Sequence, residues 1–421
     1  METYLICLAV ALVGGLMMSR LTKLVHLPVV TAYLVAGLLL GPFCIGALGL
    51  KGLGFNSLEQ VEGLRIVTQT ALGFIAFTIG NEFRMTQLKA MGSRAIVIGI
   101  LQAVITTALV DVVLVVLSLC FPSVITIPCA ITLGAIAAAT APAATLMVVR
   151  QYKADGPLTK LLLLVVAIDD AVGLLLFSAS FGIATALAMG HVSVTAVVVE
   201  PIVEIVLSLL LGSAMGWLLN LLERFFHSRS KRMTLSVAFV LLTVGLSMLE
   251  FDVAGIHCGF SLLLVCMMTG TIFCNVCDTS EELMSRVDGW TMPINVLFFV
   301  ISGAELDLNV LSSPVTILVG VLYIIARSLG KYFGAAVSCR ITGEPKNISD
   351  HLGITLLPQA GVALGMALTA SALPGGAMVR NVVLFAVLIY ELVGPTLTKR
   401  SLTLAGEINP EGRTSARKLN G

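Results

Sequence analysis

The sequence predicts an all-α membrane protein that crosses the bilayer many times. Of its 421 residues, 57% are hydrophobic and only 12% are charged, and the mean hydropathy is +1.02. A soluble globular domain carries roughly 25% charged residues, so this composition excludes that class. The net charge of +1 argues against a nucleic acid or an acidic partner, and no long polar block predicts a separate soluble domain.

Apolar segments that are long enough, or nearly long enough, to cross the hydrocarbon recur along the chain. A helix needs about 20 residues for a crossing, so the shorter segments, such as 290–304, must borrow flanking residues or end early. The first segment has neither a basic leader nor a small-residue cleavage site, which favours a retained helix over a signal peptide. The sequence predicts thirteen spans: 3–19, 28–43, 65–81, 95–120, 126–149, 160–186, 192–219, 234–250, 257–274, 290–304, 314–339, 352–372 and 377–398.

The positions of Lys and Arg support this count. Cytoplasmic loops of membrane proteins are enriched in both residues. With thirteen spans and an external N-terminus, twenty of the 25 basic residues fall in cytoplasmic loops or the tail, and three (Lys51, Arg65 and Arg380) fall outside. We therefore expect a multi-pass protein of the cell membrane, plasma or inner, with its N-terminus outside and a short cytoplasmic tail at 399–421.

The cysteines and histidines do not indicate a cofactor. The nine cysteines mostly lie in apolar runs, where they are expected to be small buried hydrophobic residues. Cys274 and Cys277 form a single CxxC pattern with no second pair or nearby histidine ligands, so no metal or redox site is predicted there. The five histidines fall near predicted loops and helix ends, where solvated or capping roles are expected.

The most unusual apolar segment is 160–186, because Asp169 and Asp170 lie side by side near its middle. An ionised side chain at that depth costs from about 3 to over 10 kcal/mol, so such residues usually serve an ion or proton pathway. Burial disfavours a charged carboxylate, and a nearby cation favours it. One aspartate can therefore stay ionised beside a cation while Asp170 takes up either a proton or a small cation.

Two basic residues, Arg327 and Lys331, fall inside a predicted span, 314–339. Arg327 follows Pro314 by thirteen residues, roughly 20 Å of helix, which places it near mid-bilayer. Asp169 lies at a similar depth, so the sequence predicts that Arg327 is its charge partner. Lys331 is one turn nearer the cytoplasm and is expected to extend its ammonium toward water, with an auxiliary role in the site as the alternative.

Two spans carry helix breakers at membrane depth. The fifth contains Thr140 and Pro142, and the twelfth contains Pro358 and Gln359. Proline removes a backbone donor, and freed backbone groups survive in a membrane only where protein or a cavity satisfies them. Interrupted spans at matching positions of two halves indicate a transport site formed by inverted repeats, here spans four to six and eleven to thirteen. A simple proline kink is the alternative for either span alone.

Two further acidic residues lie inside predicted spans. Asp111 in the fourth span and Glu391 in the thirteenth could balance the helix-end dipoles of the interrupted spans, or could instead be interfacial. Both are auxiliary candidates for the site, together with Gln359. Glu200 and Glu204, near the start of the seventh span, are expected at the water boundary.

Several motifs together resemble those of the bacterial monovalent cation:proton antiporter family, which includes sodium/proton exchangers. The second predicted span is similar to the family's second-helix signature, and Asp169 with Asp170 is similar to its paired-carboxylate motif. Further landmarks follow in the expected order over nearly the whole chain: Gly80 to Arg84, Gly259 to Leu263, Gly303 to Leu308, and Leu357 to Gln359.

The resemblance implies about thirteen helices with inverted repeats and two crossed, interrupted helices. Members are typically homodimers whose core moves like an elevator against a dimerisation scaffold. By this resemblance the core comprises helices within about 65–186 and part of 290–398, and the scaffold those within about 3–43 and 192–274.

The resemblance also implies roles for individual residues. Asp170 is then the main ligand of the transported cation and the proton, Asp169 pairs with Arg327, and Thr140 adds an oxygen ligand. Two positions depart from the family's pattern, because some relatives have a lysine where Arg327 lies and a glutamate about where Gly361 lies. A buried lysine can release its proton, whereas arginine effectively cannot. We therefore expect fewer protons per cation and exchange that is independent of the membrane potential.

The sequence thus predicts a secondary active antiporter, not an enzyme, that exchanges Na+ or alternatively Li+ for H+ by alternating access and serves pH homeostasis. A potassium/proton exchanger of the same fold is the nearest alternative. A passive cation channel does not account for the antiporter motifs. An intramembrane aspartyl protease needs two carboxylates that face each other, which adjacent residues of one helix do not provide.

Overall fold

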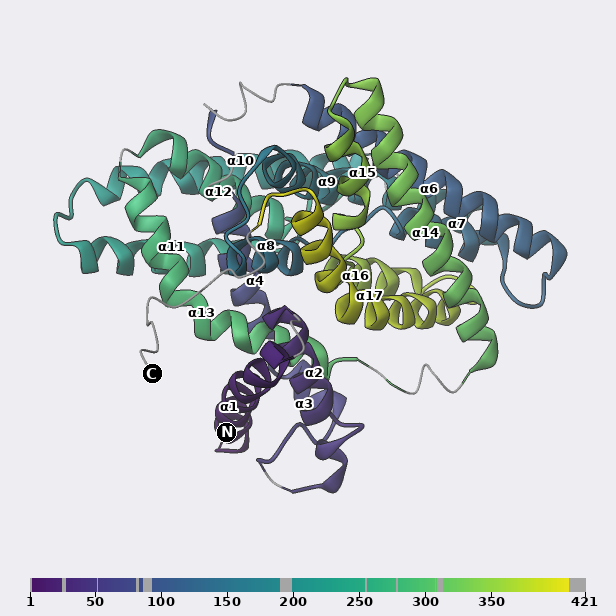
Figure 1. The fold of residues 1–421 in the computed structure, drawn as a ribbon, viewed down its shortest axis with the longest axis horizontal. Helices are drawn as coiled ribbons and strands as arrows, with labels where there is room; N and C mark the ends of the chain where they lie inside the picture. The colour runs from purple at the N-terminus through teal and green to yellow at the C-terminus, as the bar shows by residue number, and fades with distance from the viewer. Residues whose placement is uncertain are drawn as a thin grey trace.

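The computed structural model describes residues 2–24, 28–50, 52–80, 83–85, 93–189, 199–253, 256–277, 279–306, 308 and 313–408. At some of these positions, Asp170 among them, it describes the backbone alone. Several predicted features lie outside the described residues: Asn81 and Glu82 of one motif, Asp307 of another, and positions 409–421 of the tail. The described chain is almost entirely α-helical, as predicted, with one short β-hairpin (Figure 1).

In chain order the elements are α1 (Glu2–Leu24), α2 (Val29–Leu40), the 3-10 helix η1 (Ile45–Leu48), α3 (Leu58–Glu62), α4 (Arg65–Ile79), α6 (Arg94–Cys120), α7 (Ile127–Ile136), α8 (Pro142–Gln151), α9 (Pro157–Met189), α10 (Glu200–Glu223), α11 (Arg229–Ser247), β1 (Phe251–Val253), β2 (Ile256–Cys258), α12 (Leu262–Val276), α13 (Ser280–Ala304), α14 (Pro314–Ile341), α15 (Lys346–Thr355), α16 (Gly361–Ala370) and α17 (Gly376–Leu404). β1 and β2 pair antiparallel.

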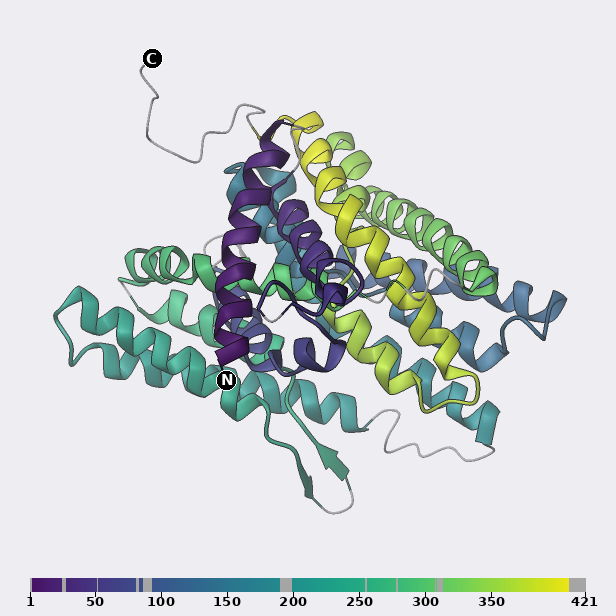
Figure 2. The same cartoon turned by 90° about the horizontal axis from the view of Figure 1, so that it is seen from below.

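Consecutive helices pack together at one end of the molecule, and helices far apart in the sequence pack together at the other. α10, α11 and α12 lie at one end, and α6, α7 and α14 lie at the other (Figures 1 and 2). α6 and α14 pack along each other, and α9 contacts both α6 and α7. Because α6, α7, α9 and α14 carry the charged and interrupted segments of the sequence, this packing brings the candidate site residues together.

The crossing of α2 and α13 shows how closely some of these helices approach. A Cβ on Gly37 would collide with the backbone carbonyl of Val300, and one on Gly303 would collide with that of Leu34. Small residues of this kind allow membrane helices to pack backbone against backbone. Glycine is therefore required on both sides of this contact.

Each of the thirteen predicted segments overlaps a described helix or helix pair, although 257–274 begins on the strand β2. Within the described residues, eight helices are long and apolar enough to cross a membrane, or up to nine if the bent helix α13 is one span. The segment 290–304 was expected to borrow flanking residues, and α13 does begin earlier, at Ser280. The chain is a multi-pass membrane protein, and the exact number of thirteen spans stays a prediction.

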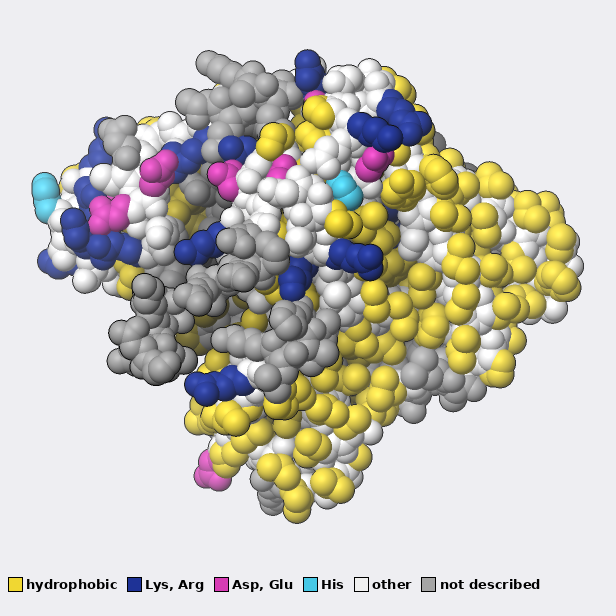
Figure 3. Space-filling model, in the orientation of Figure 1, with side chains coloured by type: hydrophobic (Ala, Val, Ile, Leu, Met, Phe, Trp, Pro, Cys, Tyr) yellow, Lys and Arg dark blue, Asp and Glu magenta, His cyan; other side chains and the backbone are white. Residues whose placement is uncertain are grey.

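The surface agrees with a lipid environment. Hydrophobic side chains cover the right-hand part of the face in Figure 3, over α6 and α14, whereas Lys, Arg, Asp and Glu gather toward its left and upper parts. Large apolar side chains such as Val112 on α6 and Leu318 on α14 are more than half exposed, at 61% and 53%. In water such a face would be unfavourable, and in lipid it needs no partner.

Candidate ion-binding site

The two interrupted spans meet at their breaks. Residues 137–141 separate α7 from α8, and residues 356–360 separate α15 from α16. Pro142 begins α8, where its missing N–H is no loss, and Pro358 lies in the second break. The backbone N–H of Ala141 donates to the carbonyl of Pro358 at 2.8 Å, which joins the two extended stretches directly.

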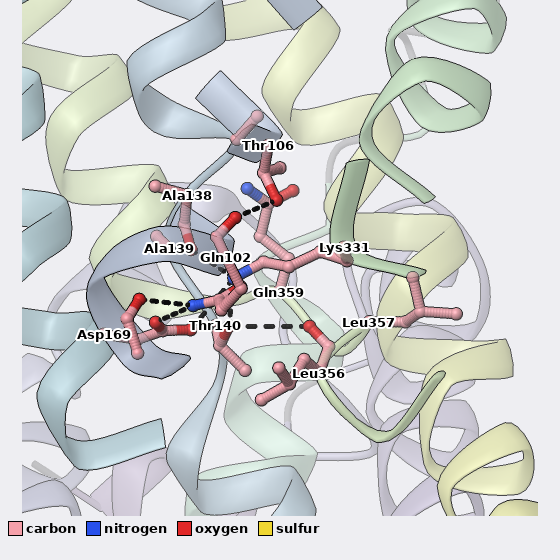
Figure 4. A network of polar contacts seen from close by, with 12 residues as sticks. Gln102, Thr106, Ala138, Ala139, Thr140, Asp169, Lys331, Leu356, Leu357 and Gln359 are labelled. Carbon is pink, nitrogen blue, oxygen red and sulfur yellow. Dashed lines mark hydrogen bonds and ion pairs between the residues drawn. The ribbon is translucent and has the colours of Figure 1, made fainter. Parts of the chain in front are cut away.

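Asp169 of α9 is fully buried beside the first break (Figure 4). Its Oδ2 accepts hydrogen bonds from Thr140 Oγ1 at 2.6 Å and from Lys331 Nζ at 2.9 Å. Its Oδ1 accepts a hydrogen bond from the side-chain amide of Gln102 on α6. These three donors replace the water that burial removes from the carboxylate.

Lys331 of α14 is the cation of this cluster, and its side chain is fully buried. Four oxygens lie within 3.0 Å of its Nζ: the backbone carbonyl of Ala138 at 2.6 Å, Asp169 Oδ2 at 2.9 Å, and Gln102 Oε1 and Thr140 Oγ1 at 3.0 Å. An ammonium has three protons to donate, so its capacity is fully used. Gln102 contacts both charges, because its amide donates to Asp169 and its carbonyl accepts from Lys331.

Arg327, one turn earlier on α14, serves the backbone instead. Its Nε donates to the carbonyl of Ala137 at 3.0 Å, and its two terminal nitrogens donate to those of Ala139 and Leu357 at 2.7 Å. The guanidinium also lies 4.5 Å from the ring centroid of Tyr390. Because the first two carbonyls follow the C-terminal end of α7, the positive charge also offsets the partial negative charge of that helix end.

The predicted ion pair of Asp169 with Arg327 is therefore wrong, as is the prediction that Lys331 extends toward water. The two basic residues are four positions apart on one face of α14. Their positions along the helix therefore could not show which of them contacts Asp169. The planar guanidinium, with five donors in a wide fork, suits separate carbonyls, whereas the compact ammonium fits into a cluster of oxygens that includes one carboxylate oxygen. The expectation of exchange independent of the membrane potential rested on a guanidinium beside Asp169 and loses its basis.

Gln359 holds the second break against the first. Its Nε2 donates to the carbonyl of Ile136 and to the hydroxyl of Tyr323, both at 3.0 Å, and all three residues are buried. The four consecutive carbonyls of residues 136–139 thus receive donors from Gln359, Arg327 and Lys331. Side chains satisfy the backbone groups that the interruption frees, as the membrane requires.

Gln102 is a site residue that the sequence reasoning missed. It is fully buried on α6 and contacts both charges of the cluster. The available signal was an amide inside the apolar span 95–120, followed one turn later by Thr106, whose hydroxyl donates to the Gln102 carbonyl at 2.7 Å. A polar pair of this kind in a span indicates a face turned toward protein rather than lipid.

The two auxiliary acids lie on helices that frame the cluster. Asp111 of α6 packs against α7, where a Cβ on Gly134 would collide with its carboxylate. Glu391 of α17 is buried and adjoins Tyr390. In the described part of the chain, Asp111 Oδ1 and Glu391 Oε2 have no hydrogen-bond partner. Neither acid belongs to the hydrogen-bond network of Asp169 among the described residues.

Asp170, the predicted main ligand, is described only by its backbone, which continues α9 directly after Asp169. Its side chain therefore lies outside the described structure. Thr140 is described fully and contacts both Asp169 and Lys331. The structure thus brings together Thr140, Asp169 and Lys331 of the predicted set and places Arg327, Gln359 and both prolines immediately around them.

A buried ion pair beside two joined, interrupted spans, in a multi-pass helical protein, defines a secondary transporter. Residues 8–403 match the family model for the transmembrane sodium/hydrogen exchanger, and the chain belongs to that family. The resemblance found in the motifs is confirmed. The family is one of sodium/hydrogen exchangers, that is, of transporters and not of enzymes.

The fold is similar to two solved structures of the sodium proton antiporter MjNhaP1 from Methanocaldococcus jannaschii. The structure at pH 8 aligns with a TM-score of 0.70 at 18% identity and covers 95% of this chain and 97% of that one. A structure from an electron-microscopy map aligns with a TM-score of 0.72 at 16% identity and covers 97% and 98%. The predicted antiporter fold is thus confirmed.

A shorter match links the chain to a plant protein, K(+) efflux antiporter 5 of Arabidopsis thaliana. The two are 38% identical over 95 residues, which is 23% of this chain and 14% of that protein. The match therefore spans only a small part of the plant protein's length.

Proposed function

We propose that this antiporter exchanges Na+ for H+, with Li+ as a second substrate, and that Asp170 binds the cation and the proton in turn. The observation that carries the proposal is the engagement of both oxygens of Asp169 by Gln102, Thr140 and Lys331. Since Lys331 already balances the charge of Asp169, the neighbouring carboxylate is the one left for the transported ions. Asp170 follows on the same helix, about 100° further round.

Coupled exchange follows if the transport core crosses the membrane only when the charge of Asp170 is compensated. A proton or a dehydrated alkali cation meets this condition, whereas a bare carboxylate would add about 3 kcal/mol or more to the crossing. Oxygen ligands suit hard cations. The hydroxyl of Thr140 and the carbonyls of residues 137–139, each of which keeps a second lone pair, support a cation site beside the first break.

The choice of Na+ draws on the family and on the sodium proton antiporter of the same fold. The alternative is K+, which the partial match to a K(+) efflux antiporter supports. Both cations are hard and would use the same oxygen ligands, so the difference between them rests on the size of the site.

We further propose the arrangement in the membrane. The excess of Lys and Arg in alternate loops supports an external N-terminus and a cytoplasmic C-terminus. The core then comprises helices within about 65–186 and part of 290–398, the scaffold those within about 3–43 and 192–274, and the protein works as a homodimer. The convergence of α6, α9, α14 and the first break on one ion pair supports a core that moves as one body.

The test is an exchange assay in proteoliposomes with a fluorescent pH probe inside, challenged in turn with Na+, Li+ and K+. We expect the parent protein to move protons in response to Na+ and Li+, and Asp170→Asn to give no response, because the amide cannot alternate between charged and neutral forms. Asp155→Asn, which alters an exposed acid paired with Lys160 at the surface, is the matched control and should behave like the parent.

Two outcomes would change the proposal. A response of the parent to K+ alone would establish the potassium/proton alternative. Equal responses from the parent and Asp170→Asn would remove Asp170 from the mechanism.

A further inference from the structure

The helix that carries the two aspartates begins without a cap of its own. α9 starts at Pro157, and Gly156 precedes it with no side chain to accept from the first backbone N–H groups. An uncapped helix start leaves up to four donors without a partner, and Ser, Thr, Asp or Asn usually fills this role. Pro157 removes one of these donors and the N–H of Lys160 donates to the carbonyl of Gly156 at 3.1 Å, so the N–H groups of Leu158 and Thr159 remain.

A carboxylate from the other end of the sequence accepts both. Glu407 Oε1 accepts from the backbone N–H of Leu158 at 2.7 Å, and Glu407 Oε2 accepts from that of Thr159 at 2.6 Å. The Thr159 hydroxyl also donates to Oε2 at 2.6 Å, and the N–H of Asp155 donates to the Glu407 backbone carbonyl at 3.2 Å. A negative charge at a helix N-terminus is also stabilised by the helix dipole.

The end of α17 directs Glu407 to this place. The N–H of Gly406 donates to the carbonyl of Thr403, and the N–H of Glu407 donates to that of Leu402. This is the Schellman pattern, with Gly406 in the left-handed conformation at φ 78°. Ile408, the next residue, is buried against the core and anchors the turn.

The fit at the start of α9 is specific to glycine. A Cβ on Gly156 would collide with the carboxyl carbon of Glu407. The absence of a side chain at Gly156 therefore leaves the space that the Glu407 carboxylate occupies at the start of α9.

The same end of α17 also contacts the helices next to both breaks. The side-chain amide of Asn347 on α15 donates to the carbonyl of Ala405 at 3.0 Å. The ammonium of Lys399 lies 4.8 Å from the ring centroid of Tyr152, which follows α8. The end of α17 thus contacts α9 through Glu407, in addition to α8 and α15.

We propose that Glu407 is a positioning residue of the transport site. Its carboxylate fastens α9 to the end of α17, and this contact holds Asp169 in register with Lys331 and Thr140, which α14 and the first break supply. Asp169 lies twelve residues along α9 from Pro157, roughly 18 Å, within one continuous helix that transmits a shift of its end. The transport readout used below rests on the exchange activity proposed above.

The test uses three full-length variants in proteoliposomes. Glu407→Ala removes the cap and the side-chain tether, and leaves only the backbone contact between Asp155 and position 407. Glu407→Ala combined with Gly156→Asp restores a local cap in the space that Glu407 vacates, but not the tether to α17. Glu407→Gln keeps one oxygen acceptor and serves if Glu407→Ala does not give stable protein. For each variant, hydrogen exchange of the Leu158 and Thr159 amides reports the cap, and the half-saturating cation concentration reports the site.

We expect Glu407→Ala to raise the half-saturating cation concentration about fivefold or more, because small misplacements of binding groups have large effects. In the double variant the two amides should regain protection while the half-saturating concentration stays high. If the double variant restores both quantities, Glu407 is a helix cap and the proposal is wrong. An unchanged half-saturating concentration in Glu407→Ala or Glu407→Gln also overturns it. A parent without exchange activity would instead contradict the proposed function.

Discussion

Replacing Lys331 with methionine should slow exchange by about 100-fold or more. Methionine keeps most of the side-chain volume but removes the ammonium, and Arg327 is committed to three carbonyls and does not replace it. A buried carboxylate that loses its partner costs about 3–5 kcal/mol, so Asp169 would take up a proton, and the hydrogen bonds that its carboxylate accepts from Gln102 and Thr140 would be disturbed. The measurement is the initial exchange rate in proteoliposomes at saturating cation.

A double variant separates charge balance from transport. Asp169→Asn with Lys331→Met removes both charges, so its thermal stability should exceed that of either single variant while exchange stays low. Lys160→Met is the matched control, since that lysine is 46% exposed and pairs with Asp155 at the surface. We expect the control to lose less than about 1 kcal/mol of stability and to exchange normally. A parental exchange rate in Lys331→Met would remove this lysine from the site.

Replacing Arg327 with lysine should be strongly destabilising although it keeps the positive charge. A single ammonium cannot reach the carbonyls of Ala137, Ala139 and Leu357 together, so two of them would lose their donor. At about 1–3 kcal/mol for each buried unpaired group, the loss in unfolding free energy should be about 2–6 kcal/mol. The contact with the Tyr390 ring would also weaken.

The loss should lower the temperature above which the detergent-solubilised protein is no longer monodisperse. Arg94→Lys is the control, because Arg94 is 61% exposed and its contact with Glu344 is 3.5 Å long. We expect this control to shift the transition little. Equal shifts for the two substitutions would show that Arg327 does not support the two breaks as described.

The fold followed from the sequence because composition and spacing act locally. The apolar segments predict the spans, the alternation of basic loops predicts their orientation, and Pro142 and Pro358 mark both interruptions. The bend in α13 and the β-hairpin between α11 and α12 were not predicted, since neither has a strong local signal. The motif resemblance added the family, which the comparisons confirm.

The site was less predictable, because it depends on which side chains meet. Arg327 and Lys331 lie one turn apart on the same helix. Which of them pairs with Asp169 depends on the backbone carbonyls that the two breaks leave without helical partners, and no spacing rule in the sequence shows these contacts. Gln102 carries no charge and so gave a weak signal. Glu407 reaches α9 across nearly 250 positions of sequence, and only the structure reveals that Gly156 leaves room for it.

We propose that one carboxylate beside the neutral pair of Asp169 and Lys331 is shared between a proton and an alkali cation. Binding of the radioactive cation to the purified protein, measured over a range of pH, tests this most directly. We predict that the half-saturating concentration rises as the pH falls, by up to about tenfold per pH unit, because protons then occupy the same carboxylate. The number of ions bound per chain should stay constant, and Asp170→Asn should bind none. A half-saturating concentration that does not change with pH, or full binding by Asp170→Asn, would show that the proton and the cation do not compete for Asp170.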